Sequence, residues 1–524
     1  MPLSLPLLLL TLLTSVPVSR GADPARLLLG WSTFDERAMA RIDSEQLLGV
    51  LRELELPVDP ETREQRDLAL CAFVGRLTRL DAGTHSRQLL PATLTALDRR
   101  RDSGDASEFD RFLIERVALM GDRVSLEQRL GACRGLAGSR LPKVTPTMAL
   151  LTREKSPDLR AAACRTLIGR VDVLASDALL TAACTSPARQ QALFDSLLER
   201  HLDALDGATV LDSAWNTELA TRLGQHVLVR TLDPDWHVAS PAIRLAAHVE
   251  PYRAAAVLTE ALELWTDRER AAAEDRRLSR TGLRRMRFEC ADALTRLTGR
   301  ELGPDPDRWG QFWNGVRNGA SFQAAFDADS SNDTTARFFG LDLRSNAVAF
   351  VIDASGSMEV QLANDGGRYG SVSSAATRYE AACTELLRAL NDAAAGTEFR
   401  VILFSENGRS WRSSAVEATE ASLDSARDWL RRRHPDGGTL LSSGLGHLIG
   451  KGDPEDLRSL DIDTVVLLCD GETAEGAGWA DAWLETYNRD AQLVFHAVQF
   501  GGARAATLQR FSEATGGSFV RLAE

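Results

Sequence analysis

The stretch "AFVIDASGSM", residues Ala349–Met358, decides how the C-terminal part of this chain folds. Four apolar residues run into Asp353, and Ser355 and Ser357 follow with a glycine between them. A short apolar run bounded by a turn is typical of a strand buried on both faces of a parallel sheet. The carboxylate and the two hydroxyls are hard oxygen donors, which suit Mg²⁺, Ca²⁺ or Mn²⁺ better than zinc or copper.

Strands and helices alternate from Asn346 to the end of the chain. The expected strands are 347–353, 397–405, 461–470, 491–500 and 518–522, and the expected helices are 376–393, 421–433, 479–490 and 503–517. This order predicts a doubly wound, Rossmann-like α/β domain with a mostly parallel sheet and helices on both faces. Ligands in such folds bind beyond the carboxyl ends of the strands. Asp353 and Asp470 each follow a strand directly, so we expect both carboxylates in one crevice.

Three separated motifs carry a resemblance to a known family. The motif "DASGS" is joined by a threonine after two glycines in "DGGTLLSSGL" and by the aspartate of "VVLLCDGET". Together they resemble the metal-ion-dependent adhesion site of the von Willebrand factor type A family, over residues 346–524. The residues concerned are Asp353, Ser355, Ser357, Thr439 and Asp470.

The resemblance implies a role for each of these residues. The three hydroxyls would bind the cation, Mg²⁺ or else Mn²⁺ or Ca²⁺, and the two carboxylates would act directly or through water. A Glu or Asp of another protein would take the remaining coordination position. An insert at 359–376, rich in Gly and Ser, departs from the family pattern. It is interpreted either as a cover for the metal site or as a surface loop.

The region 34–317 carries helical periodicity almost throughout. In "SPDLRAAACRTLIGRV", Ser156 is the expected N-cap, Pro157 opens the helix, and apolar residues follow on one face. Paired helices at such spacing are similar to HEAT repeats and predict an all-α solenoid, with a plain helical bundle as the alternative. The arginine-rich segment 267–287 is interpreted as a solvated helix face.

Between the two domains we expect a linker, and before them an export signal. Residues 318–345 are rich in Asn, Asp, Ser and Thr, and "RFFGLDL" within them is expected to dock its two phenylalanines on a domain. Residues 1–22 have the leucine-rich core and small-residue end of a signal peptide. We therefore expect a secreted or periplasmic protein whose mature chain has no transmembrane helix.

The seven cysteines could form disulfides in an exported chain, but most lie in alanine- and leucine-rich helical patterns. We expect small buried side chains at Cys71, Cys133, Cys164, Cys184 and Cys290. The odd count leaves at least one thiol without a partner in the chain, and the absence of a CxxC pair argues against a zinc site.

Composition narrows the function further. A chain of 524 residues with a formal net charge of −13 predicts several domains and does not favour nucleic acid as a partner. We expect an exported binding, adhesion or scaffold protein that is not an enzyme. One alternative is a structural scaffold in which the metal only stabilises the domain. Another is Mg²⁺-dependent phosphoryl transfer, which typically uses a second aspartate at the position of Ser355.

Overall fold

The computed structural model describes residues 23–522, except 35, 40, 55, 57, 80–83, 103–105, 187, 207–216, 250, 276, 319–335, 363–375, 451–453 and 472. The expected signal peptide and most of the expected linker and insert therefore lie outside the described residues. The chain divides into two compact units, Met1–Leu167 and Ile168–Glu524. Within the described part, no helix combines the length and apolar character that crossing a bilayer requires.

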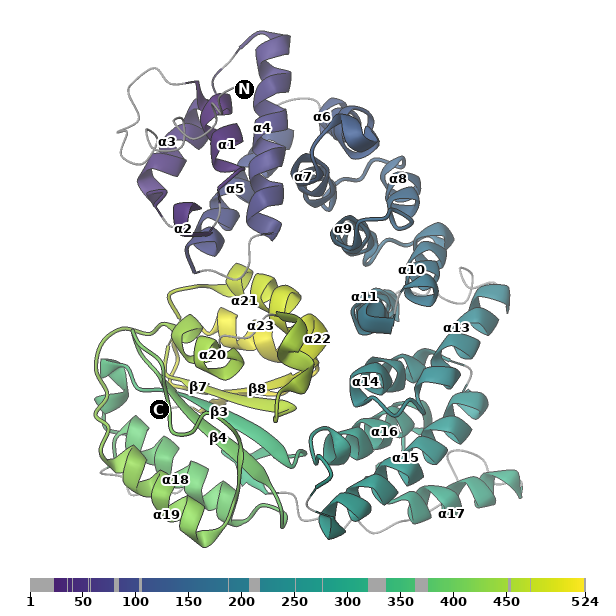
Figure 1. The fold of residues 1–524 in the computed structure, drawn as a ribbon. Helices are drawn as coiled ribbons and strands as arrows, with labels where there is room; N and C mark the ends of the chain where they lie inside the picture. Colours follow the sequence, from purple (N-terminus) through teal and green to yellow (C-terminus); the bar gives the residue numbers. More distant parts are fainter. Residues whose placement is uncertain are drawn as a thin grey trace, which may run out of the picture. The chain divides into compact units, whose positions relative to one another are not determined.

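The first unit is built from helices (Figure 1). They are α1 Pro24–Trp31, α2 Glu36–Met39, α3 Ser44–Leu54, α4 Pro60–Arg79, α5 Thr84–Asp102, α6 Ala106–Phe112, the π-helix Leu113–Ala118, the 3₁₀ turn Gly121–Arg123, α7 Leu126–Leu136, α8 Val144–Leu151 and α9 Pro157–Leu167. Ser156 caps α9 as predicted, because its Oγ accepts a hydrogen bond from the Leu159 amide at 3.3 Å. Gly75 of α4 and Gly131 of α7 let these two helices touch, since a Cβ at either position would overlap the other backbone.

The second unit begins with further helices. They are α10 Val173–Thr185, α11 Ala188–Asp206, α13 Thr217–Arg230, α14 Trp236–Leu245, the 3₁₀ turn Ala246–His248, α15 Pro251–Glu274, α16 Leu283–Thr298 and α17 Pro306–Arg317. The prediction of a helix-rich N-terminal region is confirmed. Its division into HEAT-like repeats stays a prediction, as do the predicted domain boundaries.

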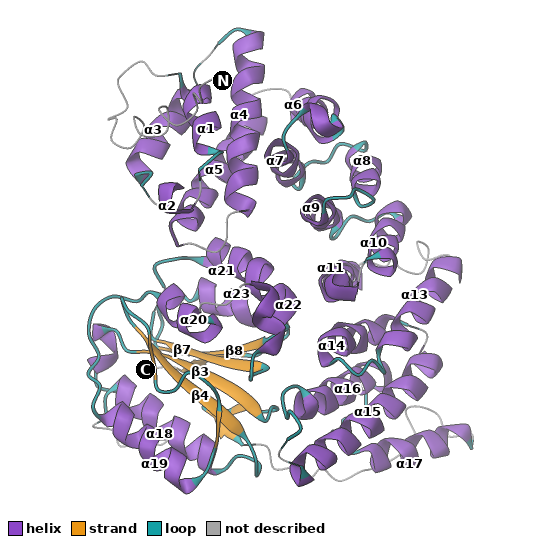
Figure 2. Ribbon diagram, viewed as in Figure 1, coloured by secondary structure: helices purple, strands orange, loops and turns teal. Residues whose placement is uncertain are grey.

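A seven-stranded sheet follows in the second unit (Figure 2). Its strands are β3 Ala347–Asp353, β4 Glu398–Phe404, β5 Arg409–Ser410, β6 Val416–Glu417, β7 Thr464–Cys469, β8 Val494–Phe500 and β9 Phe519–Leu522. The order is β5-β4-β3-β7-β8-β9, and β6 also pairs with β4. The five longer strands are parallel, as predicted, whereas β5 and β6 run antiparallel to β4. The sequence does not reveal these two because two residues are too few for a period-2 pattern.

Helices cover both faces of the sheet (Figure 2). One face packs on α18 Arg378–Asn391 and α19 Glu420–Arg431, and the other packs on α20 Leu441–Ile449, α21 Ala477–Trp483 and α23 Ala506–Thr515. The connecting pieces are the 3₁₀ turns Gly356–Glu359 and Pro454–Ser459, the π-helix Leu484–Asn488 and α22 Arg489–Ala491. β1 Arg337–Phe338 and β2 Leu341–Asp342 form a hairpin. This hairpin places Phe338 and Phe339 in the hydrophobic core between the sheet and the helices α18 and α19. The predicted docking of the two phenylalanines is therefore confirmed.

The amino ends of the central strands are held by α16 and by the loop before it. Arg285 Nη1 donates to the carbonyls of Asp463 and Gln492 at 3.0 and 2.5 Å, just before β7 and β8. Arg280 Nη1 donates to the Gly396 carbonyl before β4 at 2.6 Å. The interpretation of the arginine-rich segment as a solvated face is therefore wrong for 280–287, which is buried against the sheet, whereas Asp267, Arg270 and Arg277 are exposed as predicted. Helical periodicity does not show that a neighbouring domain supplies buried acceptors for these guanidinium groups.

Candidate metal centre

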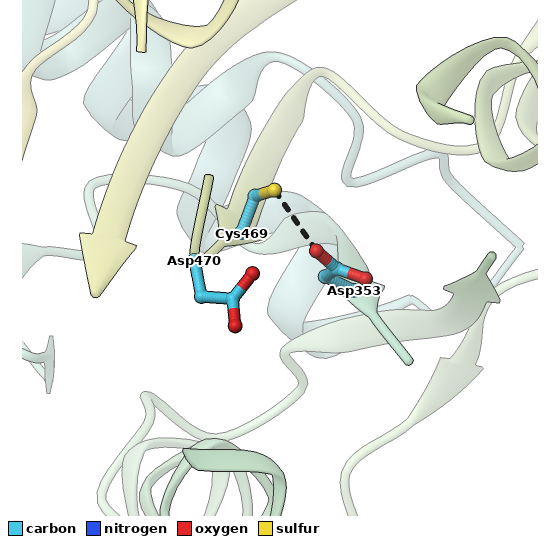
Figure 3. Close-up of side chains that lie close together, drawn as sticks. All are labelled: Asp353, Cys469 and Asp470. Carbon is cyan, nitrogen blue, oxygen red and sulfur yellow. Dashed lines mark hydrogen bonds between the residues drawn. The ribbon is translucent and has the colours of Figure 1, made fainter. Parts of the chain in front are cut away.

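The carboxyl ends of β3 and β7 bring two aspartates together. The strands are paired in parallel, with Ile352 opposite Leu468, so the residues that end or follow them meet at one edge. Asp353 closes β3 and Asp470 follows β7, and both are buried. Ligand atoms of these two carboxylates and of Cys469 all lie within 4.8 Å of one another (Figure 3). The expected single crevice is therefore present.

The two serines of the first motif join this group by hydrogen bonds. The Ser355 amide donates to Asp353 Oδ1 at 2.7 Å, which turns the chain out of the strand. The hydroxyls of Ser355 and Ser357 are 3.1 Å apart, and Ser357 Oγ donates to Asp470 Oδ1 at 2.9 Å. Ser355 is buried and Ser357 is exposed, so the group reaches the surface through Ser357. Four of the five expected ligands are thus linked in one series of hydrogen bonds, which Asp353 joins through the Ser355 amide.

Thr439 comes to the same edge through its backbone. The Gly356 amide donates to the Gly437 carbonyl at 3.1 Å, and the Ala474 amide donates to the Thr439 carbonyl at 3.1 Å. The loop that carries Thr439 therefore lies between the serine loop and the loop after Asp470. The Thr439 side chain is half-buried. Its hydroxyl as a ligand stays a prediction.

Two charged side chains hold the helix that follows Thr439. Glu475, from the loop after β7, accepts the Ser442 amide of α20 at 2.6 Å, at the positive end of the helix dipole. At the other end, Arg400 donates to the carbonyls of His447 and Leu448, both at 3.1 Å. These contacts hold both ends of the nine-residue helix that follows the Thr439 loop.

Burial sets the charge balance of the site. Burial raises the pKa of Asp353 to about 6, and the nearby Asp470 also raises it, although hydrogen bonds from Cys469 and Ser355 act in the opposite direction. Burial likewise raises the pKa of the Cys469 thiol well above its usual range, so the sulfur keeps its proton and donates to Asp353 Oδ2 at 2.9 Å. Two buried carboxylates this close repel each other when both are ionised, so a bound cation would stabilise them.

Sequence reasoning missed two members of the site. Arg378, the first residue of α18, donates to Asp470 Oδ2 at 2.6 Å and to the Ser357 carbonyl at 3.3 Å. Cys469, expected only as a buried strand residue, bonds to Asp353. The position of Cys469 directly before the predicted ligand Asp470 was the signal that could have identified it as part of the site. Arg378 gave no such signal because it is distant in sequence from both motifs that it contacts.

The residues present fit a hard divalent cation. Two carboxylates and the serine hydroxyls are oxygen donors, and the one sulfur is a protonated thiol, which is a poor ligand. In the loop after Asp470, Thr473 Oγ1 and Glu475 Oε2 are buried without a hydrogen-bond partner among the described residues. The edge is therefore rich in oxygen atoms whose negative charge or lone pairs the protein does not fully satisfy.

Comparison with known proteins gives a family for this region. Residues 369–520 match the family model described as the von Willebrand factor type A domain. That range includes Thr439 and Asp470 and begins after the serine loop. The inter-alpha-trypsin inhibitor heavy chain H1 of Mesocricetus auratus is 33% identical over 154 residues, and that of Homo sapiens is 32% identical over 153 residues. Each alignment covers 28% of this chain and 15% of the relative, so the chain spans only a small part of the curated relatives that it matches.

Two solved structures illustrate the structural matches. A von Willebrand factor type A protein from Catenulispora acidiphila aligns with a TM-score of 0.26 and 18% identity, over 34% of this chain and 38% of that one. Proximal thread matrix protein 1 from the mussel byssus, described with a zinc-occupied MIDAS motif, aligns with a TM-score of 0.24 and 19% identity, over 34% of this chain and 42% of that one. The match to the family model, over residues 369–520, assigns this part of the chain to a von Willebrand factor type A domain.

Proposed function

We propose that this chain is an exported binding protein whose C-terminal domain grips an acidic group of a partner protein through a divalent cation. The side chains that would hold Mg²⁺, or else Mn²⁺ or Ca²⁺, are those of Asp353, Ser355, Ser357, Thr439 and Asp470. When bound, the cation offers a coordination position to a carboxylate from outside the chain. The observation that carries the proposal is the hydrogen-bonded series from Ser355 through Ser357 to Asp470 at an exposed sheet edge.

Each residue has a defined task in this proposal. Hydroxyl ligands are neutral, so Ser355 and Ser357 would leave most of the cation's charge available to an anionic partner. Arg378 adds a positive charge beside Asp470 and favours an acidic partner for the same reason. Asp353, the most deeply buried of the group, anchors the serine loop through the Ser355 amide.

The helical region is proposed as a platform made of HEAT-like repeats, and the domain organisation as 34–317, a linker 318–345 and 346–524. We also propose that residues 1–22 are a signal peptide that directs export. Support comes from the helix-rich N-terminal region and from the capped helix start at Ser156. The relatives' name, inter-alpha-trypsin inhibitor heavy chain, is compatible with a role in protein–protein association.

The test is a double variant, Ser355→Ala with Ser357→Ala. Calorimetric titration of MgCl₂ or MnCl₂ into the wild-type protein should give heat, and the double variant should give none while keeping its thermal unfolding midpoint. Ser413→Ala with Ser414→Ala is the matched control, since both serines are exposed in a loop away from the motifs. Equal cation binding by wild type and the double variant would refute the metal site.

A second measurement separates binding from stabilisation. Capture of proteins on the immobilised chain in Mg²⁺, followed by elution with EDTA, should release a partner that the double variant does not retain. If the cation raises the unfolding midpoint but capture is insensitive to EDTA, the metal only stabilises the domain. Phosphatase turnover with Mg²⁺ that disappears in Asp353→Ala would instead favour the enzyme alternative.

A further inference from the structure

Three helices of the second unit place the side chains of a cysteine, a histidine and an aspartate next to one another. Cys184 lies in the last turn of α10, Asp195 lies on α11 and His226 lies on α13. Cys184 Sγ is 3.4 Å from His226 Nδ1, and His226 Nε2 is 2.7 Å from Asp195 Oδ1. A thiol, a base and a carboxylate that orients the base are the arrangement that activates nucleophilic cysteines. These residues belong neither to the sheet nor to the metal centre.

The exposure of Cys184 differs from the prediction. All seven cysteines are described and none forms a disulfide; five are buried, Cys383 is half-buried, and Cys184 is exposed. The expectation of a buried side chain at Cys184 is therefore wrong. Its helical pattern is alanine-rich as predicted, but it lies in the last turn, where the helix face opens to solvent.

The aspartate determines which protons the histidine carries. Asp195 is fully buried and accepts from Arg230 Nη1 at 2.7 Å through its other oxygen. An ionised carboxylate only accepts, so His226 Nε2 carries a proton and Nδ1 faces the sulfur. Burial alone would lower the pKa of His226, but hydrogen bonds with Asp195 and Cys184 outweigh it and raise the pKa to about 9. The ring is therefore positively charged near pH 7, despite the repulsion from Arg230.

An open pocket of about 420 Å³ lies in front of the sulfur. It is lined by Cys184, Arg222, Gln225, His226, Val229 and Arg230. Arg222 is held in place by Asp177 at 2.5 Å and by the Thr181 hydroxyl at 3.0 Å, and its side chain is still 35% exposed. Val229 is 78% exposed and offers an apolar contact at the rim. Guanidinium groups and an apolar rim suit a small organic anion.

We propose that Cys184 is a nucleophilic thiol that exchanges with small, carboxylate-bearing disulfides bound in this pocket. The Cys184 thiol loses its proton to water, the positively charged His226 ring stabilises the resulting thiolate, and this sulfur attacks one sulfur of the disulfide. A new S–S bond forms to Cys184, the old S–S bond breaks, and its electron pair leaves on the second sulfur as a thiolate that His226 can protonate. Cys184 is oxidised to a mixed disulfide and the small disulfide is reduced to one thiol.

The test uses the full chain and two aromatic disulfide probes. Dithiobis(nitrobenzoate) is dianionic and dithiodipyridine is neutral, and each releases a coloured thiol. Since Cys184 is the one exposed cysteine, the native protein should release about one equivalent rapidly, and Cys184→Ser should release none in that phase. At pH 6.5 the wild-type rate with the dianionic probe should exceed that of N-acetylcysteine at least tenfold, because a thiol beside a cationic imidazole is more often ionised.

Two variants show which residues are responsible for the fast reaction of Cys184. His226→Gln should reduce the rate to that of N-acetylcysteine. Arg222→Gln should slow the dianionic probe about fivefold and leave the neutral probe unchanged, because only the former binds the guanidinium group. EDTA should change none of these rates, which separates this site from the metal centre.

Three outcomes would overturn the proposal. One is a wild-type rate no greater than that of N-acetylcysteine, and another is an unchanged rate in a folded His226→Gln variant. If that variant unfolds, which the reaction of more than one thiol would show, the comparison of the wild type with N-acetylcysteine decides instead. Equal effects of Arg222→Gln on both probes would contradict the preference for anions.

Discussion

The two ends of the same sheet each bury an aspartate, and they treat it differently. At the amino end, Asp463 is fully buried and its carboxylate accepts from the Gly282 amide and the Thr464 hydroxyl, both at 2.7 Å, while Arg285 binds its carbonyl. At the carboxyl end, Asp353 accepts from one amide and one thiol and has a second carboxylate, Asp470, beside it. At the amino end one carboxylate has the positive charge of Arg285 nearby, whereas at the carboxyl end two carboxylates share the one guanidinium group of Arg378.

The difference shows where each end obtains its stability. Replacing one partner of a buried, fully bonded group leaves the other uncompensated, which is costly to the fold. A cluster of like charges gains instead from an added cation. We therefore expect variants at the amino end to change folding stability and variants at the carboxyl end to change cation binding.

The largest expected effect is at the amino end. Arg285→Ala should lower the free energy of unfolding in urea by about 3–5 kcal/mol, because this side chain is 5% exposed and its loss leaves buried acceptors unpaired. Arg270→Ala, where the arginine is 67% exposed in a pair with Asp267, is the control and should change it by less than about 0.5 kcal/mol. Equal stability of the two variants would contradict the comparison.

The second largest effect is expected from acid, which should destabilise the amino end of the sheet. Burial, together with the positive charges of Arg344 and Arg285, lowers the pKa of His496 to about 4, against the opposing charge of Asp342. Its neutral Nδ1 accepts the Ser518 amide at 3.0 Å, a bond that protonation would break. The unfolded chain thus binds a proton that the folded chain does not, and this stability is present above the ordinary pKa of 6.5 and is lost as the pH falls toward 4.

The measurement compares wild type with His496→Asn in urea from pH 7 to pH 4.5. Asparagine keeps an acceptor but cannot be protonated, so the wild type should lose about 1–2 kcal/mol more than the variant over this range. The figure is below the full value of the shift because the ring is partly exposed. Parallel pH curves for the two proteins would show that His496 is not responsible.

A smaller effect is expected at Thr439, on cation binding. Thr439→Val preserves shape and removes the hydroxyl, so the Mg²⁺ dissociation constant should rise about tenfold, with an unchanged unfolding midpoint. Thr384→Val, at an exposed position of α18, is the control and should bind as the wild type does. Unchanged affinity in Thr439→Val would remove this residue from the ligand set.

The smallest effect is expected at Arg378. Its guanidinium lies 2.6 Å from Asp470 Oδ2 and so opposes a second positive charge at that oxygen. Arg378→Gln should lower the Mg²⁺ dissociation constant about threefold, since the neutral amide no longer repels the cation. Weaker binding in this variant would show instead that Arg378 orients Asp470 for the cation.

Part of the fold and of the metal centre could be predicted from the sequence because the signals for them are local. Near-continuous apolar strands alternating with amphipathic helices identify the α/β domain, and the position of Asp353 and Asp470 at strand ends places both at one edge of a parallel sheet. The short antiparallel strands β5 and β6 carried no such signal. Neither did the exposure of Cys184, whose neighbours in the chain are those of a buried helix.

By itself, the sequence determined the doubly wound domain, the helix-rich region before it and the residue types that meet at the carboxyl edge. Those properties depend on spacing along the chain, since strand and helix periods repeat over a few residues. The tertiary structure alone decided that Arg378 pairs with Asp470, that Arg285 binds carbonyls before β7 and β8, and that Cys184 meets His226. Each of these contacts joins residues more than forty positions apart. Such pairs are set by how the elements pack, which no local pattern encodes.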